Sequence, residues 1–412
     1  MMKRLLRSVA FVLALCLCLA LAVGSACAKD LAELSCGKMD FLLYQCTLQD
    51  GRLLLGGGTD RDENRGLAAW IMCLNTDRTV SWEYNGREDG YAAALYATVL
   101  QDGTVAVMMQ DPDNKRSVVY FTPDGAEARE KLDLAGLQGT LYTVTPSFIL
   151  SCESTETETG DSLCRAFLYD WDGKEITRYN APVMQDGFRF LAADGDECIM
   201  FGSDMAPHSH GVIRKLDSSP DQVLWETVLD WQLPRADTAK LDHLIKTADG
   251  GYAGWLMEGR PGEEEGAPYE WNTFLVKFDA DGRFLWVKNI TANGPERGPM
   301  FVYGDRIGVF CADSPRIDAF RYILWVGEDG TELGTTEIRL DPEAFTVLRN
   351  YLQPEAPGEK RTTILDQCQF IPMEDGLWAM ATCWVANELG DEGFNTIFDS
   401  QEIVMFRIPA SE

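Results

Sequence analysis

The amino-acid sequence predicts an all-β fold made of seven repeated four-stranded units, and three observations support that prediction. Short apolar runs alternate with turn signals along the chain, whereas helical periodicity is nearly absent. Two kinds of hairpin phrase alternate and together span about 50 residues per repeat. The composition, 46% hydrophobic and 10% aromatic, supplies enough apolar surface for a substantial core, so a disordered chain is not expected.

Residues 1–28 are expected to be an export signal and not part of the fold. Basic residues near the N-terminus precede an apolar run of 15 residues at 9–23, and Ala26-Cys27-Ala28 fits the pattern of signal cleavage. A membrane-spanning helix needs about 20 apolar residues. The run is too short for such a helix, and no later segment is predicted to span a membrane. We therefore expect residues 29–412 to be secreted or held at the cell surface.

Lipidation of Cys27 is the alternative to free secretion. Gly24-Ser25-Ala26-Cys27 matches three of the four positions of a bacterial lipobox, but Gly24 replaces the usual apolar residue. We favour free secretion for that reason. A lipid on Cys27 would keep the protein on the outer leaflet of the cell membrane.

The segment that follows residue 28 is strongly acidic. The whole chain carries a formal net charge of −29, and removal of the three positive charges in residues 1–28 brings it to −32. Such a chain repels nucleic acid phosphates, so nucleic acid is not an expected partner. Asp279-Ala280-Asp281-Gly282 begins like a calcium loop but lacks the acidic residue that would complete it. No cofactor is therefore predicted, and a calcium site built from several units has no motif in its favour.

The first kind of hairpin phrase carries a turn such as Gln-Asp-Gly between two apolar runs. It occurs at residues 46–58, 97–109, 141–152, 190–202, 244–256, 301–310 and 369–381. The second kind occurs at residues 70–85, 118–132, 166–180, 211–228, 274–290 and 322–338. In the 274–290 copy, Val276 and Phe278 alternate with polar partners, and Asp281-Gly282 suits a tight turn. Each pair of hairpins predicts four consecutive strands, A to D.

Four strands in about 50 residues is the size of a β-propeller blade. The units begin near residues 40, 92, 139, 187, 241, 298 and 363, which predicts a single seven-bladed β-propeller. The seventh unit has two strands and a third at 402–409. We expect the strand-like segment 30–38 to supply its fourth strand and to close the ring, leaving no open sheet edge.

The repeat resembles that of secreted bacterial β-propeller proteins. The phrase DGGYAGWL, followed by FLVKFDADGRFLW within 249–286, carries the resemblance. Trp82, Trp225 and Trp286, which follow the second turn, are similar to the tryptophans of quinoprotein-type blades. The fuller docking motif of those enzymes is missing, so we interpret the three tryptophans as blade-packing residues. The resemblance implies the fold and leaves the activity open, because propellers serve in both binding and catalysis.

Function is expected at the end of the blades that bears the long B–C and D–A connections, because long loops on a rigid scaffold commonly carry binding sites. Aromatic residues in or beside these connections are the candidate ligand contacts, since a flat ring offers an apolar face beside polar groups. They are Trp231, Tyr269, Trp271, Trp384 and Phe394. Packing between blades is the equally weighted alternative for these rings.

Two further kinds of site are weaker candidates. Asp204, His208 and His210 share one loop and could contribute ligands to zinc or a similar ion, although a solvated loop is the favoured interpretation. Nine cysteines remain after residue 28, and most lie in apolar runs, where buried thiols act as small hydrophobes. Cys152 and Cys164 flank one polar loop and are the candidate disulfide pair.

The sequence thus favours an extracellular module that binds a peptide, a protein or a glycan. No serine-nucleophile or zinc-protease motif is present, and with three histidines acid–base chemistry would depend on carboxylates. A glycan hydrolase or lyase with carboxylates at the channel mouth is the alternative. A surface protein with a purely structural role is a third possibility, and it would need neither feature.

Overall fold

A computed structural model of the chain describes sixteen stretches of it. These are residues 41–59, 67–156, 162–182, 185–192, 198–204, 209–216, 223–232, 236–262, 270–290, 296–313, 319–338, 340, 360–373, 376–388, 394–396 and 402–408. The predicted export signal, Cys27 and the segment 30–38 lie outside these stretches. Their roles, ring closure by residues 30–38 included, stay predictions.

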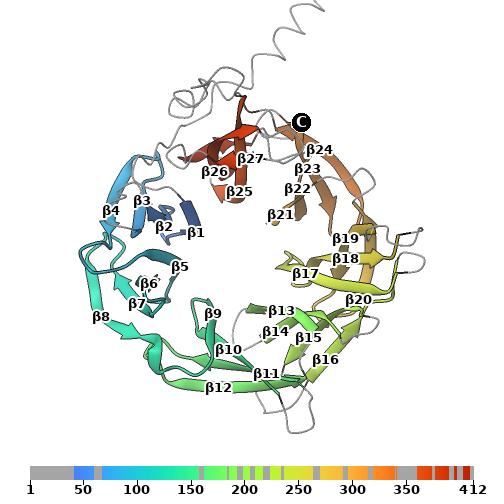
Figure 1. Cartoon of the computed structure of the whole chain (residues 1–412), viewed down its shortest axis with the longest axis horizontal. Coiled ribbons are helices and arrows are strands. Elements are labelled where there is room, and N and C mark those ends of the chain that lie inside the picture. The colour runs from blue at the N-terminus through green and yellow to red at the C-terminus, as the bar shows by residue number, and fades with distance from the viewer. Residues whose placement is uncertain are drawn as a thin grey trace, which may run out of the picture. The chain divides into compact units, whose positions relative to one another are not determined.

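The chain is all-β and forms seven antiparallel sheets, which are the blades of a seven-bladed β-propeller (Figure 1). Blade one contains β1 (Phe41–Thr47), β2 (Leu53–Thr59), β3 (Ala68–Leu74) and β4 (Val80–Asn85). Blade two contains β5 (Ala93–Val99), β6 (Val105–Gln110), β7 (Arg116–Phe121) and β8 (Glu127–Asp133). Blade three contains β9 (Thr140–Val144), β10 (Ile149–Glu156), β11 (Ser162–Tyr169) and β12 (Glu175–Pro182).

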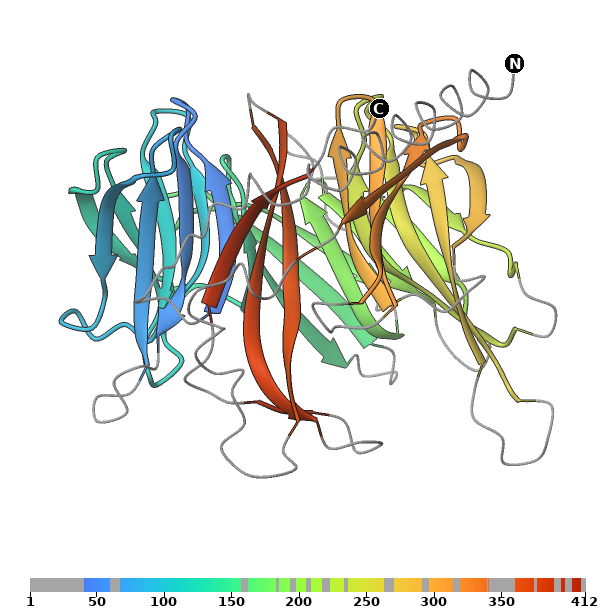
Figure 2. The same ribbon diagram turned by 90° about the horizontal axis from the view of Figure 1, so that it is seen from above.

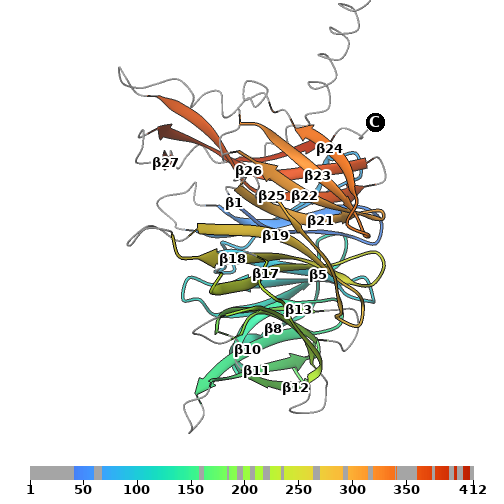
Figure 3. The same cartoon turned by 90° about the vertical axis from the view of Figure 1, so that its right-hand side faces the viewer.

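The later blades repeat this order. Blade four contains β13 (Gln185–Ala192), β14 (Cys198–Ser203), β15 (Gly211–Leu216) and β16 (Val223–Val228). Blade five contains β17 (Thr238–Lys246), β18 (Tyr252–Arg260), β19 (Glu270–Phe278) and β20 (Phe284–Asn289), of which β17, β18 and β19 are labelled side by side in Figure 3. Blade six contains β21 (Glu296–Tyr303), β22 (Arg306–Ala312), β23 (Arg321–Gly327) and β24 (Glu332–Ile338).

Blade seven is built differently from the other six. It contains β25 (Arg361–Met373), β26 (Gly376–Glu388), β27 (Phe394–Thr396) and β28 (Glu402–Arg407), and its two long first strands are drawn in red-orange in Figure 2. Both β27 and β28 pair with β26, at different positions along it. The predicted strand at 402–409 is therefore confirmed as β28, in the third position of the sheet.

Two compact units are formed by this chain. One comprises residues 37–311 and 323–335, and the other comprises residues 312–322 and 336–412, which include blade seven. The seven repeats predicted from the hairpin phrases are confirmed, and so is the four-stranded unit. The segment 341–361, in which Asp341 and Pro342 suit the start of a helix, lies almost wholly outside the described residues.

Middle strands are buried on both faces where a blade packs against neighbours on either side. Strand β3 is buried at all seven positions, and β14 at all six. The expected alternation of buried and polar positions is therefore wrong for β19. Lys277 is as fully buried as its neighbours Val276 and Phe278. A strand that is covered on both faces is usually apolar along its whole length. A charged side chain buried within it needs partners.

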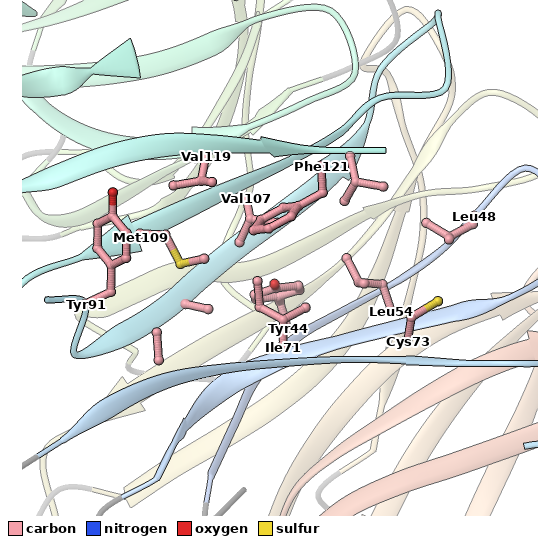
Figure 4. Packing of buried hydrophobic residues seen from close by; sticks show 13 residues of the cluster. Tyr44, Leu48, Leu54, Ile71, Cys73, Tyr91, Val107, Met109, Val119 and Phe121 are labelled. Atoms are coloured by element: carbon pink, nitrogen blue, oxygen red, sulfur yellow. The ribbon is translucent and has the colours of Figure 1, made fainter. Parts of the chain in front are cut away.

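Blades one and two share one apolar cluster (Figure 4). Its members include Tyr44, Leu54, Ile71, Val107, Met109 and Phe121, which come from strands of both sheets. The ring of Tyr44 lies across Gly56, where an added Cβ would stand 2.0 Å from the ring atom Cζ. The glycine run at 56–58 thus makes room for a core ring.

A tryptophan on the outer strand of one blade docks on the C–D turn of the next. The Trp82 indole donates a hydrogen bond to the Pro123 carbonyl (2.8 Å), and the Trp286 indole donates one to the Glu328 carbonyl (2.9 Å). Trp225 lies on the next blade's Gly282, which Thr227 also contacts through a hydrogen bond to its carbonyl (2.6 Å). Their interpretation as blade-packing residues is confirmed.

Arginine takes the tryptophan's place between blades two and three. Arg129 on β8 donates to the Trp171 carbonyl (3.3 Å), the same acceptor that Tyr120 uses through its hydroxyl (2.8 Å). The Arg129 guanidinium also stacks 3.9 Å from the centre of the Tyr120 ring. Four junctions, between blades one and two, two and three, four and five, and five and six, therefore share one kind of contact with different side chains, which we call the interblade latch.

The latch predicts a difference between two glycines that share the same backbone conformation. Gly282 (φ 75°) and Gly250 (φ 83°) both lie in turns, but a Cβ at Gly282 would meet the Trp225 ring at 2.3 Å, whereas one at Gly250 meets nothing within 4 Å. Both Gly→Ala variants bear the cost of positive φ, about 1–2 kcal/mol. We expect Gly282→Ala to lower the free energy of unfolding by about 1–3 kcal/mol more than Gly250→Ala does, because its methyl group overpacks the Trp225 ring. Urea unfolding of both variants measures this difference, and equal losses would contradict the docking role of Gly282.

Candidate functional site

The ends of blades four and five that carry the long connections hold most of the predicted site residues that the structure describes. Neighbouring strands are antiparallel, so the B–C and D–A connections leave a blade at one end and the A–B and C–D turns at the other. We call these the long-loop end and the short-turn end. The middle parts of several long connections, including 205–208, 233–235 and 263–269, lie outside the described residues.

Trp231 is a packing residue at this end. Its ring stacks on His210, with the two ring centres 4.7 Å apart and the planes 6° from parallel. Its indole nitrogen donates to the Ser209 carbonyl (3.1 Å), and the side chain packs against the cluster that contains Leu256 and Phe274. Partial burial and a satisfied donor favour the packing alternative for Trp231 over ligand contact.

Asp204 and His210 of the predicted metal site do come together. The backbone N–H of His210 donates to one Asp204 carboxylate oxygen, and His210 Nδ1 lies 3.1 Å from the other. His208 lies outside the described residues. Three metal-ligating side chains do not converge anywhere in the part of the chain that the structure describes. The pair therefore fixes the loop and the His210 ring against Trp231, and a metal ion there stays a prediction.

Ser209 ties the same loop to blade five. Its side-chain oxygen lies 2.9 Å from the Thr238 hydroxyl, and its backbone N–H donates to the Asp237 carbonyl (3.2 Å). Nearby, the backbone N–H of Gln232 donates to both carboxylate oxygens of the buried Glu258 (2.8 and 2.9 Å). The long-loop ends of blades four and five are thus held by a hydrogen-bonded network, which makes them a rigid support.

Trp271 differs from Trp231 because almost half of its side chain, 48%, is exposed. It is the second residue of β19 and lies directly opposite Gly259 of β18, which in turn pairs with Thr238 of β17. An added Cβ at Gly259 would lie 3.0 Å from the six-membered part of the Trp271 ring. The missing side chain at Gly259 lets the ring lie against the sheet, while almost half of the residue stays exposed.

The strand register places Trp231 and Trp271 on different sides of blade five. Residues opposite one another in neighbouring strands share a face, and successive residues alternate. Trp271 and Gly259 therefore face away from Leu256 and Phe274, against which Trp231 packs. The two rings therefore do not form one aromatic surface, although both lie in or beside long connections of the sequence.

An ion pair sits beside Trp271 at the same strand ends. Arg260 and Glu270 are opposite one another, and Arg260 Nε donates to a Glu270 oxygen at 2.7 Å. Their side chains remain 32% and 44% exposed. By the register described above, Glu270 and its partner Arg260 face the side of the sheet opposite Trp271, so the ion pair flanks the strand end and does not lie on the face of the ring.

The other predicted aromatic contacts are less informative. Tyr269 lies outside the described residues, and for Phe394 the structure describes only its backbone in β27. Trp384 is partly buried on β26, opposite Ile364. None of the three is tested as a ligand contact.

The register of blade three bears on the predicted disulfide. Cys152 stands opposite Ala166, and Cys164 stands opposite Ser154, so the two cysteines are diagonal neighbours. Diagonal neighbours lie about 7–8 Å apart, whereas a disulfide joins Cβ atoms about 3.5–4.5 Å apart. The pairing stays a prediction that this register does not favour.

Elsewhere, burial raises the pKa of the Cys368 and Cys46 thiols to about 12, as expected for thiols that act as packing groups.

Catalytic carboxylates would have to converge on the innermost strands. Asp242 on β17 is the one acid of those strands whose side chain the structure describes, and it pairs with Lys240 at 3.1 Å. Asp242 is the extra residue of a β-bulge, which the sequence pattern did not reveal. His243 follows it; desolvation by the surrounding chain lowers the pKa of its imidazole, and Asp242 partly opposes that shift. Nothing in these contacts favours a hydrolase.

Comparison with known proteins yields likenesses in structure alone. No protein-family model matches the chain, and no curated protein matches its sequence. The β-propeller domain of the trilobed protease from Pyrococcus furiosus is similar over 87% of this chain and 95% of its own, with 8% identity and a TM-score of 0.49. An acylaminoacyl peptidase from Pyrococcus horikoshii is similar over 86% of this chain and 52% of its own, with 11% identity and a TM-score of 0.46. The described part of the chain contains no helix suited to crossing a membrane.

The different settings of Trp231 and Trp271 predict different effects on stability. We expect Trp231→Ala to lose about 2 kcal/mol or more of unfolding free energy, because it removes a packed ring. We expect Trp271→Ala to change that free energy by less than about 0.5 kcal/mol, as for other exposed positions. Urea unfolding at pH 7 compares the two variants. A large loss for Trp271→Ala would assign that ring to the core.

Proposed function

We propose that the protein is an exported binding module, with its ligand site at the long-loop end of blade five. The observation that carries this proposal is the Trp271 ring, which lies against Gly259 and is 48% exposed. Large exposed rings on a rigid support are favourable contacts, because they contribute area without loss of much conformational freedom. The ligand is a peptide or a glycan whose apolar face covers the ring.

The network around Ser209 and Glu258 supports the same proposal. A binding residue is most effective when the elements beneath it are fixed before the ligand arrives. Ser209 and Gln232 bind groups on β17 and β18, so the strand ends next to that of Trp271 are held by hydrogen bonds. Binding there would order few additional groups.

The function is tested by glycan and peptide arrays probed with the protein, with and without calcium. We expect saturable binding that Trp271→Ala weakens by at least about tenfold, which corresponds to the loss of about 1.4 kcal/mol at an aromatic contact. Phe284→Ala is the matched control, because Phe284 is 41% exposed at the short-turn end of the same blade.

Three results would speak against the proposal. Equal binding by the wild type and Trp271→Ala would remove the ring from the site. Equal losses in Trp271→Ala and Phe284→Ala would indicate a general effect on blade five. Arrays that stay blank with and without calcium would favour a structural role.

A further inference from the structure

Three charged groups meet where the short-turn end of blade five contacts blade six. Lys277 of β19 is fully buried, and its ammonium nitrogen lies 2.9 and 2.7 Å from the two carboxylate oxygens of Asp249. The same nitrogen donates to the Phe278 carbonyl (3.2 Å). Glu328, in the β23–β24 turn of blade six, places its Oε2 4.0 Å from the ammonium. One cation is thus shared by two acids from different blades.

Asp249 is the acid that neutralises Lys277. Besides the ammonium, its carboxylate accepts hydrogen bonds from the Thr247 hydroxyl (2.7 Å) and the Gly251 backbone N–H (2.9 Å). Burial alone would raise the pKa of Asp249, but its hydrogen bonds with Glu328, Lys277 and Thr247 outweigh burial and hold that pKa below its usual range. Asp249 therefore stays ionised.

Glu328 is left as a surplus negative charge. Its Oε1 accepts the backbone N–H of Asp249 (3.1 Å), but Oε2 is buried and has no hydrogen-bond partner among the described residues. Its side chain is only 19% exposed. Burial, and then the hydrogen bond with the Asp249 carboxyl, raise the pKa of Glu328 above its usual value. An unpartnered buried carboxylate is costly, and it relieves that cost when it takes up a proton.

Two other blade junctions also place an acid of the next blade beside a cation, but there the acid is exposed to solvent. Between blades one and two, Arg52 contacts Asp50 at 2.8 Å and Asp124 of the next blade at 3.3 Å, but the Asp124 side chain is 87% exposed. Between blades two and three, Arg129 contacts Asp172, which is 84% exposed. Solvent stabilises the acid of the next blade in both places. Only Glu328, among these three acids, is withdrawn from it.

We propose that Glu328 is a proton-operated contact between blades five and six. As the pH falls from neutral, its carboxylate takes a proton from solvent, and the new hydroxyl donates a hydrogen bond to the Asp249 carboxylate across the junction. The backbone carbonyl of Glu328 already accepts a hydrogen bond from the Trp286 indole N–H. The remaining charges nearby are Lys288 with Glu332 on the outer strands, which form their own ion pair at 2.8 Å, and Asp329 of the same turn, which accepts the Thr331 N–H.

The sign of the pH dependence follows from the raised pKa of Glu328. The charged form of Glu328 lowers stability at pH values above its folded-state pKa, and this cost disappears below the pKa of an ordinary glutamate, where the folded and unfolded states are both protonated. Asp249 has the opposite sign: its lowered pKa contributes stability that is fully present above the pKa of an ordinary aspartate and is lost as the pH falls from there through its lower folded-state pKa. Mild acidification should therefore strengthen this junction before strong acid weakens it.

Glu328→Gln tests the proposal, because an amide resembles the protonated carboxyl in shape and in hydrogen bonding. We expect the variant to have a higher urea midpoint than the wild type at pH 7.5 and the same midpoint at pH 4. Glu332→Gln is the matched control: it removes an acid of the same blade from an exposed ion pair, and its midpoint should stay equal or fall slightly at pH 7.5.

Two outcomes would overturn the proposal. A midpoint for Glu328→Gln that is unchanged or lower at pH 7.5 would show that the ionised carboxylate does not weaken the junction. The same increase at pH 7.5 and pH 4 would show that the amide acts by shape and not by removing a charge.

Discussion

The structure depends on the contact between an outer strand of one blade and the C–D turn of the next. A four-stranded sheet buries little by itself, so each blade is stable only through its neighbours. The latch fixes that neighbour relation with a ring or a guanidinium on one side and a turn carbonyl on the other. In the turns that receive Trp82, Trp225 and Trp286, glycines with positive φ serve twice, because the same missing Cβ permits the turn and admits the ring. A single residue type therefore couples local chain reversal to long-range packing.

These constraints explain which features could be predicted from the sequence. Hairpins are local, and the Asp-Gly pairs that close them are visible in one dimension, so the seven repeats and the packing role of Trp286 follow from the pattern. The exposure of Trp271 could not be predicted in the same way. It depends on Gly259 standing opposite in the register, and a shift of one residue would reverse the face of every side chain in the strand. The bulges at Leu43, Leu95 and Asp242 are likewise properties of strand pairing.

Lys277 shows a second limit of the sequence pattern. A polar residue between apolar ones normally predicts the solvated face of a strand. That rule assumes one covered face, and a propeller blade has two. The lysine is tolerated because Asp249 lies in the β17–β18 turn of the same blade. A carboxylate oxygen of Asp249 is 2.7 Å from the Lys277 ammonium nitrogen. The partner is distant in sequence from Lys277, so the buried charge and its compensation are visible only in the folded chain.

Trp271 and Lys277 lie on the same strand but serve different ends of the blade. Six residues separate them, which at about 3.3 Å per residue is about 20 Å along β19. Salt screens exposed charges over about 8–10 Å, so a proton on Glu328 should have no direct electrostatic effect on a ligand at Trp271. Any influence would require β19 to move as a unit between two arrangements. The hydrogen bonds of Ser209 and Gln232 fix the long-loop ends of its neighbours β17 and β18 and oppose such movement. The Glu328 contact and the ligand site can therefore change independently at the two ends of blade five.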